Sequence, residues 1–202
     1  MALDLFGGAM RTTLPSGWLD ASDARPVPDH QEVWLEPGGG ADRSVIIEIL
    51  ERVDAADDAC AAYHFDDVAG SNGAAKATVR SVVQLTLDQL HPSLHARASA
   101  AACSVLDGLQ VLPLSCAEAR GNAEAEAAAA AEQIPASVLQ LRMAVLRLPA
   151  ESTDLLVTVN RQRATARTEA AEAAEAQAQQ ADLELLESVV RSLEVRDWGL
   201  LG

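Results

Sequence analysis

The chain contains almost no lysine: Lys76 is the only one among 202 residues, against fourteen arginines, and the formal net charge is −15. Nucleic acids and anionic membrane surfaces are bound by basic faces that neutralise phosphate, and a chain of this charge offers no such face. We therefore expect neither nucleic-acid binding nor membrane insertion. The natural counterpart of this charge is a basic surface on another protein. Solubility is the alternative interpretation, because acidic surfaces also keep proteins dispersed.

Aromatic residues, cysteines and long apolar runs are also scarce. Aromatics make up 3% of the chain, so a core must be built from leucine, valine and isoleucine. Three cysteines without CxxC spacing argue for reduced thiols in the cytoplasm or nucleus rather than a disulfide scaffold. No apolar run approaches the ~20 residues of a membrane span, and residues 1–4 show no basic leader segment. These absences predict one globular domain over 1–202, large enough to bury a core.

Sequence motifs for catalysis are absent as well. The chain has no phosphate-binding GxxxxGK[ST] and no GxSxG nucleophile elbow. His91 and His95 are four residues apart, but Pro92 interrupts the helix that would direct both to one metal ion. His64 is more simply explained as a hydrogen-bonded structural histidine. We therefore expect no catalytic site, cofactor or metal; a small hydrolase is the alternative that these absences disfavour.

The middle of the chain is rich in segments typical of β-strands. Alternating or β-branched runs bounded by Gly, Pro or Asp predict strands, and we place them near residue 3, then at 10–14, 31–36, 44–52, 77–85, 101–112, 139–148 and 155–160. The last two are joined by a short segment from Pro149 to Asp154, which favours a hairpin. Strands interrupted by a few helices predict an α+β fold with a central antiparallel sheet of about six strands.

Helices are predicted in two places. The first begins at Asp54 as the N-cap and ends near Asp67. The second is a C-terminal helix over 182–196, capped by Asp182, with apolar residues at i, i+3, i+4 and i+7. Two alanine-rich stretches accompany them: a low-complexity insertion at 117–133, and a lead-in at 164–181 to the last helix.

The densest acidic segment is DASDARPVPDHQEVWLEP, at residues 20–37. Within this segment, Pro26 and Pro28 favour an extended backbone for themselves and for the residues before them. Residues 1–70 contain 14 acidic and 4 basic residues, a net charge of −10 out of the total of −15. A stiff, extended loop that carries carboxylates is suited to contact with another molecule.

Six segments, taken in order, carry a family likeness: LFGGAM at 5–10, DASDARPVPDHQEVWL at 20–35, SVIIEILE at 44–51, YHFDDVAG at 63–70, VLRLPAESTDLLVTVN at 145–160 and DWGLLG at 197–202. The chain resembles the Ran guanine nucleotide release factors, the MOG family of nuclear import factors. The resemblance implies an α/β/α sandwich around an antiparallel sheet, related to PsbP-like proteins. It also implies binding to the small GTPase Ran, release of Ran's nucleotide, and a role in nucleocytoplasmic transport. The two alanine-rich stretches and the region 91–101 depart from the family pattern.

The resemblance also implies which residues contact Ran. Acidic residues of the SVIIEILE-type strand are important for Ran binding in the family, and here these are Glu48 and Glu51. A second group belongs to the same kind of acidic surface: Asp20, Asp29, Gln31 and Glu32. A spacing of three puts Glu48 and Glu51 on opposite faces of a regular strand, so they share a surface only if the strand twists, bulges or ends.

Other interpretations of these residues and of the whole chain stay open. Glu48 is alternatively a buried, hydrogen-bonded carboxylate; Glu51 and Glu32 are alternatively plain solvated groups; Asp20 and Asp29 are alternatively turn or cap residues. The protein is alternatively a PsbP-like subunit of a photosystem, or a non-enzymatic trafficking adaptor for membrane proteins. In the Ran-binding interpretation it is a monomer in the nucleus and cytoplasm. It would act without a catalytic group, because nucleotide release needs only tighter binding to the opened GTPase.

Overall fold

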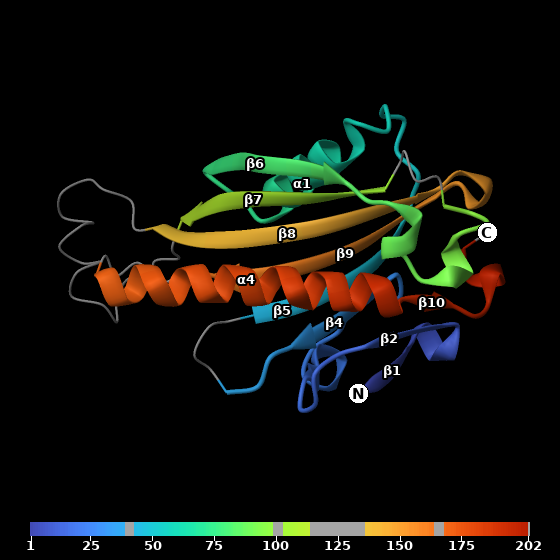
Figure 1. The fold of residues 1–202 in the computed structure, drawn as a ribbon, viewed down its shortest axis with the longest axis horizontal. Coiled ribbons are helices and arrows are strands. Elements are labelled where there is room, and N and C mark those ends of the chain that lie inside the picture. The colour runs from blue at the N-terminus through green and yellow to red at the C-terminus, as the bar shows by residue number, and fades with distance from the viewer. Residues whose placement is uncertain (39–42, 99–102, 114–135, 164–167, 202) are drawn as a thin grey trace.

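The computed structural model describes residues 1–38, 43–98, 103–113, 136–163 and 168–201. Its centre is an antiparallel sheet of seven strands in the order β3-β4-β5-β9-β8-β7-β6 (Figure 1). The strands are β3 (Leu19–Asp20), β4 (Gln31–Leu35), β5 (Arg43–Glu51), β6 (Lys76–Gln84), β7 (Cys103–Pro113), β8 (Ala136–Leu148) and β9 (Thr153–Gln162). A smaller sheet, in the order β1-β2-β10, joins the two ends of the chain; it contains β1 (Ala2–Leu5), β2 (Met10–Thr13) and β10 (Glu194–Val195). The predicted α+β class and antiparallel sheet are confirmed.

Strands β8 and β9 form the predicted hairpin. They pair from Leu139 opposite Gln162 to Leu148 opposite Thr153. A turn at Pro149–Glu151 joins them, and Ser152 closes it in the left-handed conformation, at φ 54°. Most side chains of both strands are buried, because the sheet is covered on both faces. This explains why these segments are nearly continuous apolar runs in the sequence.

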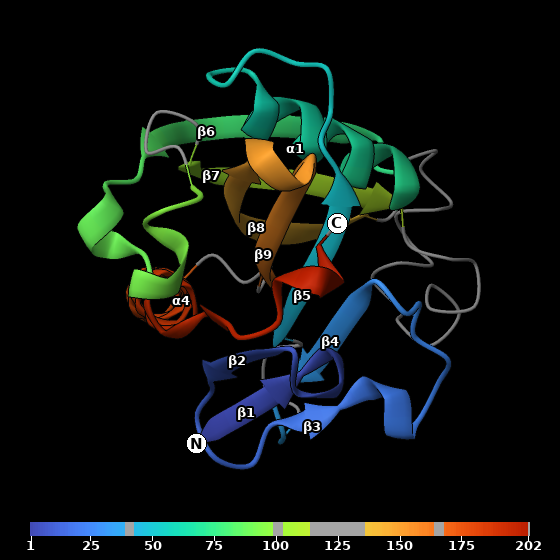
Figure 2. The ribbon, with the colours of Figure 1, turned by 90° about the vertical axis from the view of Figure 1, so that its right-hand side faces the viewer.

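One long helix covers each face of the sheet. Helix α1 (Cys60–Ser71) packs through Phe65 against a cluster that includes Leu156 of β9. Helix α4 (Glu169–Ser192) packs through Leu186 against a second cluster that includes Leu155. Since Leu155 and Leu156 are neighbours in a strand, the two clusters lie on opposite faces. Figure 2 shows the two helices on the two sides of the sheet, which is the predicted α/β/α arrangement.

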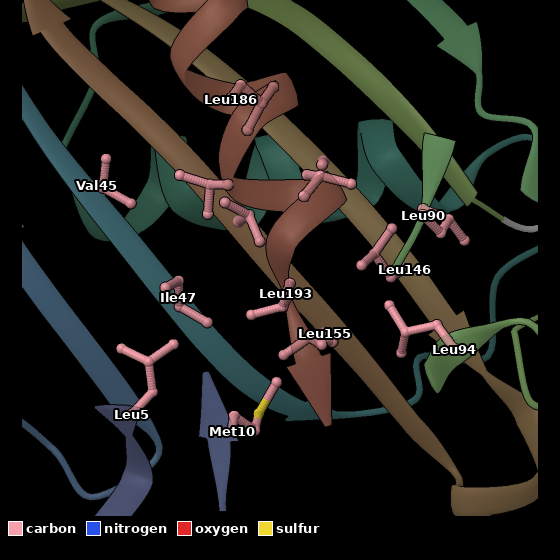
Figure 3. Packing of buried hydrophobic residues seen from close by; sticks show 14 of the residues in the cluster. Leu5, Met10, Val45, Ile47, Leu90, Leu94, Leu146, Leu155, Leu186 and Leu193 are labelled. Atoms are coloured by element: carbon pink, nitrogen blue, oxygen red, sulfur yellow. The ribbon is translucent and has the colours of Figure 1, made fainter. Parts of the chain in front are cut away.

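The core on the α4 side also includes the small sheet. Leu5 and Met10 from the N-terminal strands meet Ile47 of β5 and Leu193 just after α4 (Figure 3). Met10 is fully buried although it is the first residue of a four-residue strand. The termini are therefore part of the same core as the central sheet. Neither described helix combines the length and the apolar character that a bilayer span requires.

The predicted boundaries of both helices are wrong. Helix α1 begins at Cys60 rather than after Asp54, because Arg147 donates hydrogen bonds to the carbonyls of Val53 (2.5 Å) and Ala55 (2.7 Å). Those carbonyls therefore do not start a helix. The C-terminal helix begins at Glu169, so most of the alanine-rich lead-in at 164–181 belongs to α4. It ends at Ser192, before the predicted 196.

Asp182 does not cap the last helix, as the sequence had suggested. The N-cap is Thr168, whose hydroxyl accepts a hydrogen bond from the Ala171 N–H. Asp182 instead lies in the helix interior, 1% exposed, where its carboxylate accepts a hydrogen bond of 2.7 Å from Arg161 Nε. An aspartate followed by an apolar stripe is therefore here a buried ion-pair partner rather than a helix start. The insertion predicted at 117–133 lies outside the described residues.

Candidate functional site

The position of Glu48 and Glu51 follows from the register of β5. This strand pairs with β9 without interruption, from Arg43 opposite Arg161 to Glu51 opposite Thr153. No bulge intervenes, so the two glutamates point to opposite faces of the sheet. Glu48 lies opposite Leu156, on the α1 side, whereas Glu51 continues the row of Val45, Ile47 and Ile49 on the α4 side.

Glu48 is largely buried and hydrogen-bonded. Its side chain is 17% exposed, and its Oε1 accepts a hydrogen bond of 2.6 Å from Gln31 Nε2. His30 Nε2 lies 3.8 Å from the same oxygen. The cause is the register of β4, which places Gln31 directly opposite Glu48. These contacts join the start of β4 to β5 and leave only part of the carboxylate accessible to a partner.

Glu51 is exposed at the end of β5. It lines an open groove of about 470 Å³ with residues of the β8–β9 turn and the C-terminus, among them Ile49, Ser152 and Leu201. Within the described ranges, no ion pair involves the Glu51 carboxylate. The neighbouring arginine, Arg52, pairs with Asp57 instead, at 3.9 Å. Glu51 therefore presents a solvated negative charge next to apolar surface.

Glu48 and Glu51 lie near the same end of β5. Strand β4 begins at Gln31, opposite Glu48, and the Ile49 N–H donates to the His30 carbonyl at 2.9 Å just before it. Leu50 and Glu51 have no register partner in β4, whereas β5 stays paired with β9 through Glu51. The two glutamates are three residues apart, about 10 Å along the strand. We name this region the β5 corner: Asp29, Gln31, Glu48 and Glu51.

Asp20 and Glu32 lie elsewhere. Glu32 pairs with Ile47, on the face opposite Glu48, and its Oε1 accepts a hydrogen bond of 2.5 Å from the Phe6 N–H. Phe6 has a positive φ of 49°, so Glu32 holds the strained LFGG turn. Asp20 accepts a hydrogen bond of 2.8 Å from the Ser22 N–H and caps a short 3₁₀ helix at Ala21–Asp23. Asp20 is therefore a cap residue, which was one of the interpretations from the sequence. Glu32 is not simply solvated, because it holds the Phe6 N–H.

The Glu32 carboxyl has a perturbed pKa. Burial raises the pKa, the negative charge of Asp20 adds to the rise, and the hydrogen bond from Phe6 opposes both. A raised pKa means that the charged form destabilises the fold: the contribution is favourable at low pH and is lost as the pH rises through the folded-state pKa. The hydrogen bond to Phe6 needs an acceptor oxygen but not a charge.

Two substitutions at Glu32 separate these effects. We expect Glu32→Gln to change the free energy of unfolding at pH 7 by less than about 1 kcal/mol, because the amide oxygen still accepts from Phe6. Glu32→Ala is expected to lose about 1–3 kcal/mol, since it leaves the Phe6 N–H without this partner. Urea denaturation followed by circular dichroism measures both. Equal losses in the two variants would contradict the assigned hydrogen bond.

The most densely bonded polar cluster was not predicted from the sequence. Asp154 is fully buried, and its carboxylate accepts four hydrogen bonds. The donors are Arg147 Nε at 3.0 Å, His64 Nε2 at 3.0 Å, the Val53 N–H at 3.1 Å and Cys60 Sγ at 3.6 Å. His64 is thus the hydrogen-bonded structural histidine that the sequence had suggested. The sequence did contain one indication of this cluster: Arg147 and Asp154 are charged residues that interrupt the apolar segment 145–160 near its turn.

This cluster brings together a thiol, an imidazole and a carboxylate. The ligand atoms of Cys60, His64 and Asp154 lie within 4.8 Å of one another. The Asp154 oxygens accept hydrogen bonds from Arg147, His64 and the Val53 N–H, and burial with the nearby Asp154 carboxylate raises the pKa of the Cys60 thiol to about 12, so the free thiol is a weak nucleophile. Cys60 also contacts Asp154 rather than the histidine that would activate it. Its arrangement is that of a structural network between α1, β8 and β9.

The fold and this site define an α+β sandwich protein with an exposed glutamate at the end of β5, in a groove that Leu201 also lines. The sequence pattern of the family described as Ran-interacting Mog1 protein matches residues 3–162. The chain belongs to this family.

Several relatives share most of the chain. The human protein named Ran guanine nucleotide release factor is 41% identical over 157 residues, which cover 77% of this chain and 73% of the human one. The protein of the same name from Danio rerio is 31% identical over 203 residues, the full length of both chains. A shorter match, 41% over 78 residues, links the chain to the nuclear import protein mog1 of Schizosaccharomyces pombe; it covers 38% of this chain and 40% of that one.

Solved structures confirm the fold. The crystal structure of the Saccharomyces cerevisiae Ran-binding protein Mog1p superposes with a TM-score of 0.63 at 23% identity, covering 100% of this chain and 98% of that one. A point mutant of Mog1 gives a TM-score of 0.64 at the same identity and coverage.

Proposed function

We propose that this protein binds the small GTPase Ran through the β5 corner and promotes release of its bound guanine nucleotide. Family membership supports the partner, since the family is described as Ran-interacting and its members include Ran guanine nucleotide release factors. The proposal extends to nucleocytoplasmic transport in the nucleus and cytoplasm, because two fungal relatives are named nuclear import proteins.

The observation that carries the site assignment is the exposed carboxylate of Glu51 at the end of β5. A solvated negative charge next to Leu201 and Ile49 offers a basic side chain both an ion pair and an apolar surface for its stem. Glu48 contributes from the other face of the same strand end, and Asp29 is exposed in the turn before β4. Asp20 is left out of this contact because it lies farther along β4, opposite Trp34, and Glu32 because it holds the Phe6 N–H from the face opposite Glu48.

The proposed mechanism uses binding energy alone. A partner that binds nucleotide-free Ran more tightly than loaded Ran shifts the equilibrium toward release, and the shift is limited by that difference in affinity. The carboxylates of the β5 corner would therefore act by preferring a basic surface that the opened GTPase presents. This mechanism requires no group of the protein to take part in chemistry.

The double variant Glu48→Ala, Glu51→Ala tests this assignment. We expect it to slow release of a fluorescent guanine nucleotide from Ran by about tenfold or more, equivalent to ~1.4 kcal/mol of binding energy. The circular dichroism spectrum should stay unchanged. Glu187→Ala, an exposed carboxylate on α4, is the matched control for loss of charge and should release nucleotide at the parent rate. A double variant as fast as the control would exclude the β5 corner.

A further inference from the structure

Strand β6 is the outermost strand of the sheet at the edge remote from β4. All nine of its residues are exposed. Its valines are exposed on both faces: Val83 is 61% exposed, and Val79 and Val82 are 40% exposed each. In Figure 1 this strand lies along the outer edge of the molecule, with β7 on its inner side. An edge of this length with apolar side chains on both faces is unusual in a monomeric protein.

Among the described strands, β6 pairs with β7 alone. The Leu85 N–H donates to the Cys103 carbonyl at 2.8 Å, and Gln84 lies opposite Ser104. Because backbone groups alternate between the two sides of a strand, those of Val83 point to β7 and those of Val82 point outward. The strand therefore offers outward N–H and C=O groups that an additional strand can pair with.

The charge of this edge is opposite to that of the rest of the protein. Residues 71–87 contain Lys76, which is the only lysine, and Arg80, and no carboxylate, in a chain of net charge −15. The nearest carboxylate across the ladder, Asp107 opposite Ser81, is engaged by Arg142 at 3.6 Å. A partner strand at this edge would therefore meet two cations and no acidic side chain on β6.

We propose that the outer edge of β6 is a second docking surface, which takes an extended acidic segment of a partner protein by strand addition. Main-chain hydrogen bonds to β6 supply affinity, and the exposed valines contact alternate side chains of the added strand. Lys76 and Arg80 select acidic segments. The edge is separated from β5 by β7, β8 and β9, so this surface is distinct from the β5 corner, and both can be occupied together.

A second copy of the chain is a poorer occupant. Antiparallel pairing of two β6 strands about their middle would place Arg80 opposite Arg80, and like charges directly opposite destabilise a pair. The register shift between Val79 and Ser81 acts against any added strand in the same way, so it does not distinguish a second copy from another chain. The charge does distinguish them: the arginine that repels a second copy attracts an acidic segment.

Synthetic peptides test the proposal on the full-length protein. The probe is a nine-residue capped peptide in which valine alternates with aspartate or glutamate; its control carries lysine at every acidic position. We expect the acidic peptide to bind at least tenfold more tightly, and to protect β6 amides, but not β5 amides, from hydrogen exchange measured by NMR. Equal affinities, no binding, or protection confined to another element would overturn the proposal.

Two further measurements separate strand addition from simple charge attraction. Methylating alternate backbone nitrogens of the acidic peptide, in one of its two registers, should reduce affinity at least tenfold; no effect in either register would exclude main-chain pairing. The double variant Lys76→Glu, Arg80→Glu should reverse the preference in favour of the lysine peptide. Arg25→Glu, at an exposed arginine far from β6 along the sheet, is the matched control and should leave the preference unchanged. An unreversed preference in the double variant would also overturn the proposal.

Discussion

Replacing Asp154 with asparagine is expected to lower the free energy of unfolding by about 3–5 kcal/mol, because it leaves a buried guanidinium without its charged partner. Arg147 is fully buried, and its Nε donates to Asp154 Oδ1 at 3.0 Å. Its remaining carboxylate contact, Asp57 at 2.8 Å, is 44% exposed and therefore screened by water. Guanidinium chloride denaturation followed by circular dichroism gives the difference.

The control for this prediction is Asp57→Asn. It removes the exposed partner of the same arginine and is expected to change stability by about 1 kcal/mol or less. If Asp154→Asn were as stable as Asp57→Asn, the buried pair would have no special energetic role.

The pKa of Asp154 determines how its contribution to stability depends on pH. Burial acts to raise the pKa of Asp154, but hydrogen bonds from His64, the Val53 N–H and Arg147 outweigh it and hold the pKa below its ordinary value. This stabilisation is present above the ordinary aspartate pKa and is lost as the pH falls below it.

The second large effect is expected from Arg161→Met, which should also lower the free energy of unfolding by about 3–5 kcal/mol. Arg161 of β9 joins the sheet to α4: its Nε lies 2.7 Å from buried Asp182, and its two terminal nitrogens each lie 2.9 Å from an oxygen of Glu175. Methionine keeps most of the volume of the side chain but leaves Asp182 with Arg43 alone, at 2.9 Å. Arg163→Met is the matched control, because Arg163 contacts the same Glu175 at 2.9 Å but is 28% exposed.

Acid titration provides an independent readout of the Arg161 network. Although burial acts to raise the pKa of Glu175, hydrogen bonds from Arg161 and Gln179 and the charges of Arg161 and Arg163 lower it to about 2. A lowered carboxylate pKa contributes stability above the unfolded value of 4.5, and this is lost as the pH falls toward about 2. Removing Arg161 should therefore move the acid-unfolding midpoint to higher pH. A midpoint that stays with the Arg163→Met control would contradict the assignment.

The buried network of Arg147 and Asp154 is connected to the proposed binding site. Arg147 holds the carbonyls of Val53 and Ala55, just after Glu51, and Asp154 follows Thr153, the strand partner of Glu51. We therefore expect Asp154→Asn to disturb the β5 corner as well as stability. The double glutamate variant differs, because it loses only the hydrogen bond from Gln31, a cost of about 1 kcal/mol, and should slow nucleotide release far more than Asp154→Asn does for the stability that each loses. Measuring nucleotide release and the free energy of unfolding on both variants distinguishes residues that contact Ran from residues that stabilise the β5 corner.

Much of the fold could be predicted from local patterns. The strands at 77–85, 139–148 and 155–160 were found to within a few residues, because β-branched runs bounded by Pro, Asp or Gly encode them locally. Helix boundaries were wrong for a different reason. The start of α1 depends on Arg147, some ninety residues away, and Asp182 resembles a cap unless its partner Arg161 is known.

The candidate site could be predicted only in part. The order of motifs identified the acidic strand, and the spacing of three showed that Glu48 and Glu51 would face opposite ways in a regular strand. It could not show that β4 begins opposite Glu48, or that Gln31 therefore bonds the Glu48 carboxylate while Glu51 stays exposed. Nor could it show that Glu32 accepts the Phe6 N–H, since that contact joins segments twenty-six residues apart.

The sequence by itself determined the class of fold, the acidic character and the family, because composition, local periodicity and ordered motifs are properties of the chain alone. The tertiary structure decided which carboxylates are exposed and which are hydrogen-bonded, and that the only lysine lies on an open sheet edge. The physical reason is that exposure and pairing depend on strand register and strand order, which bring together residues that no local pattern relates.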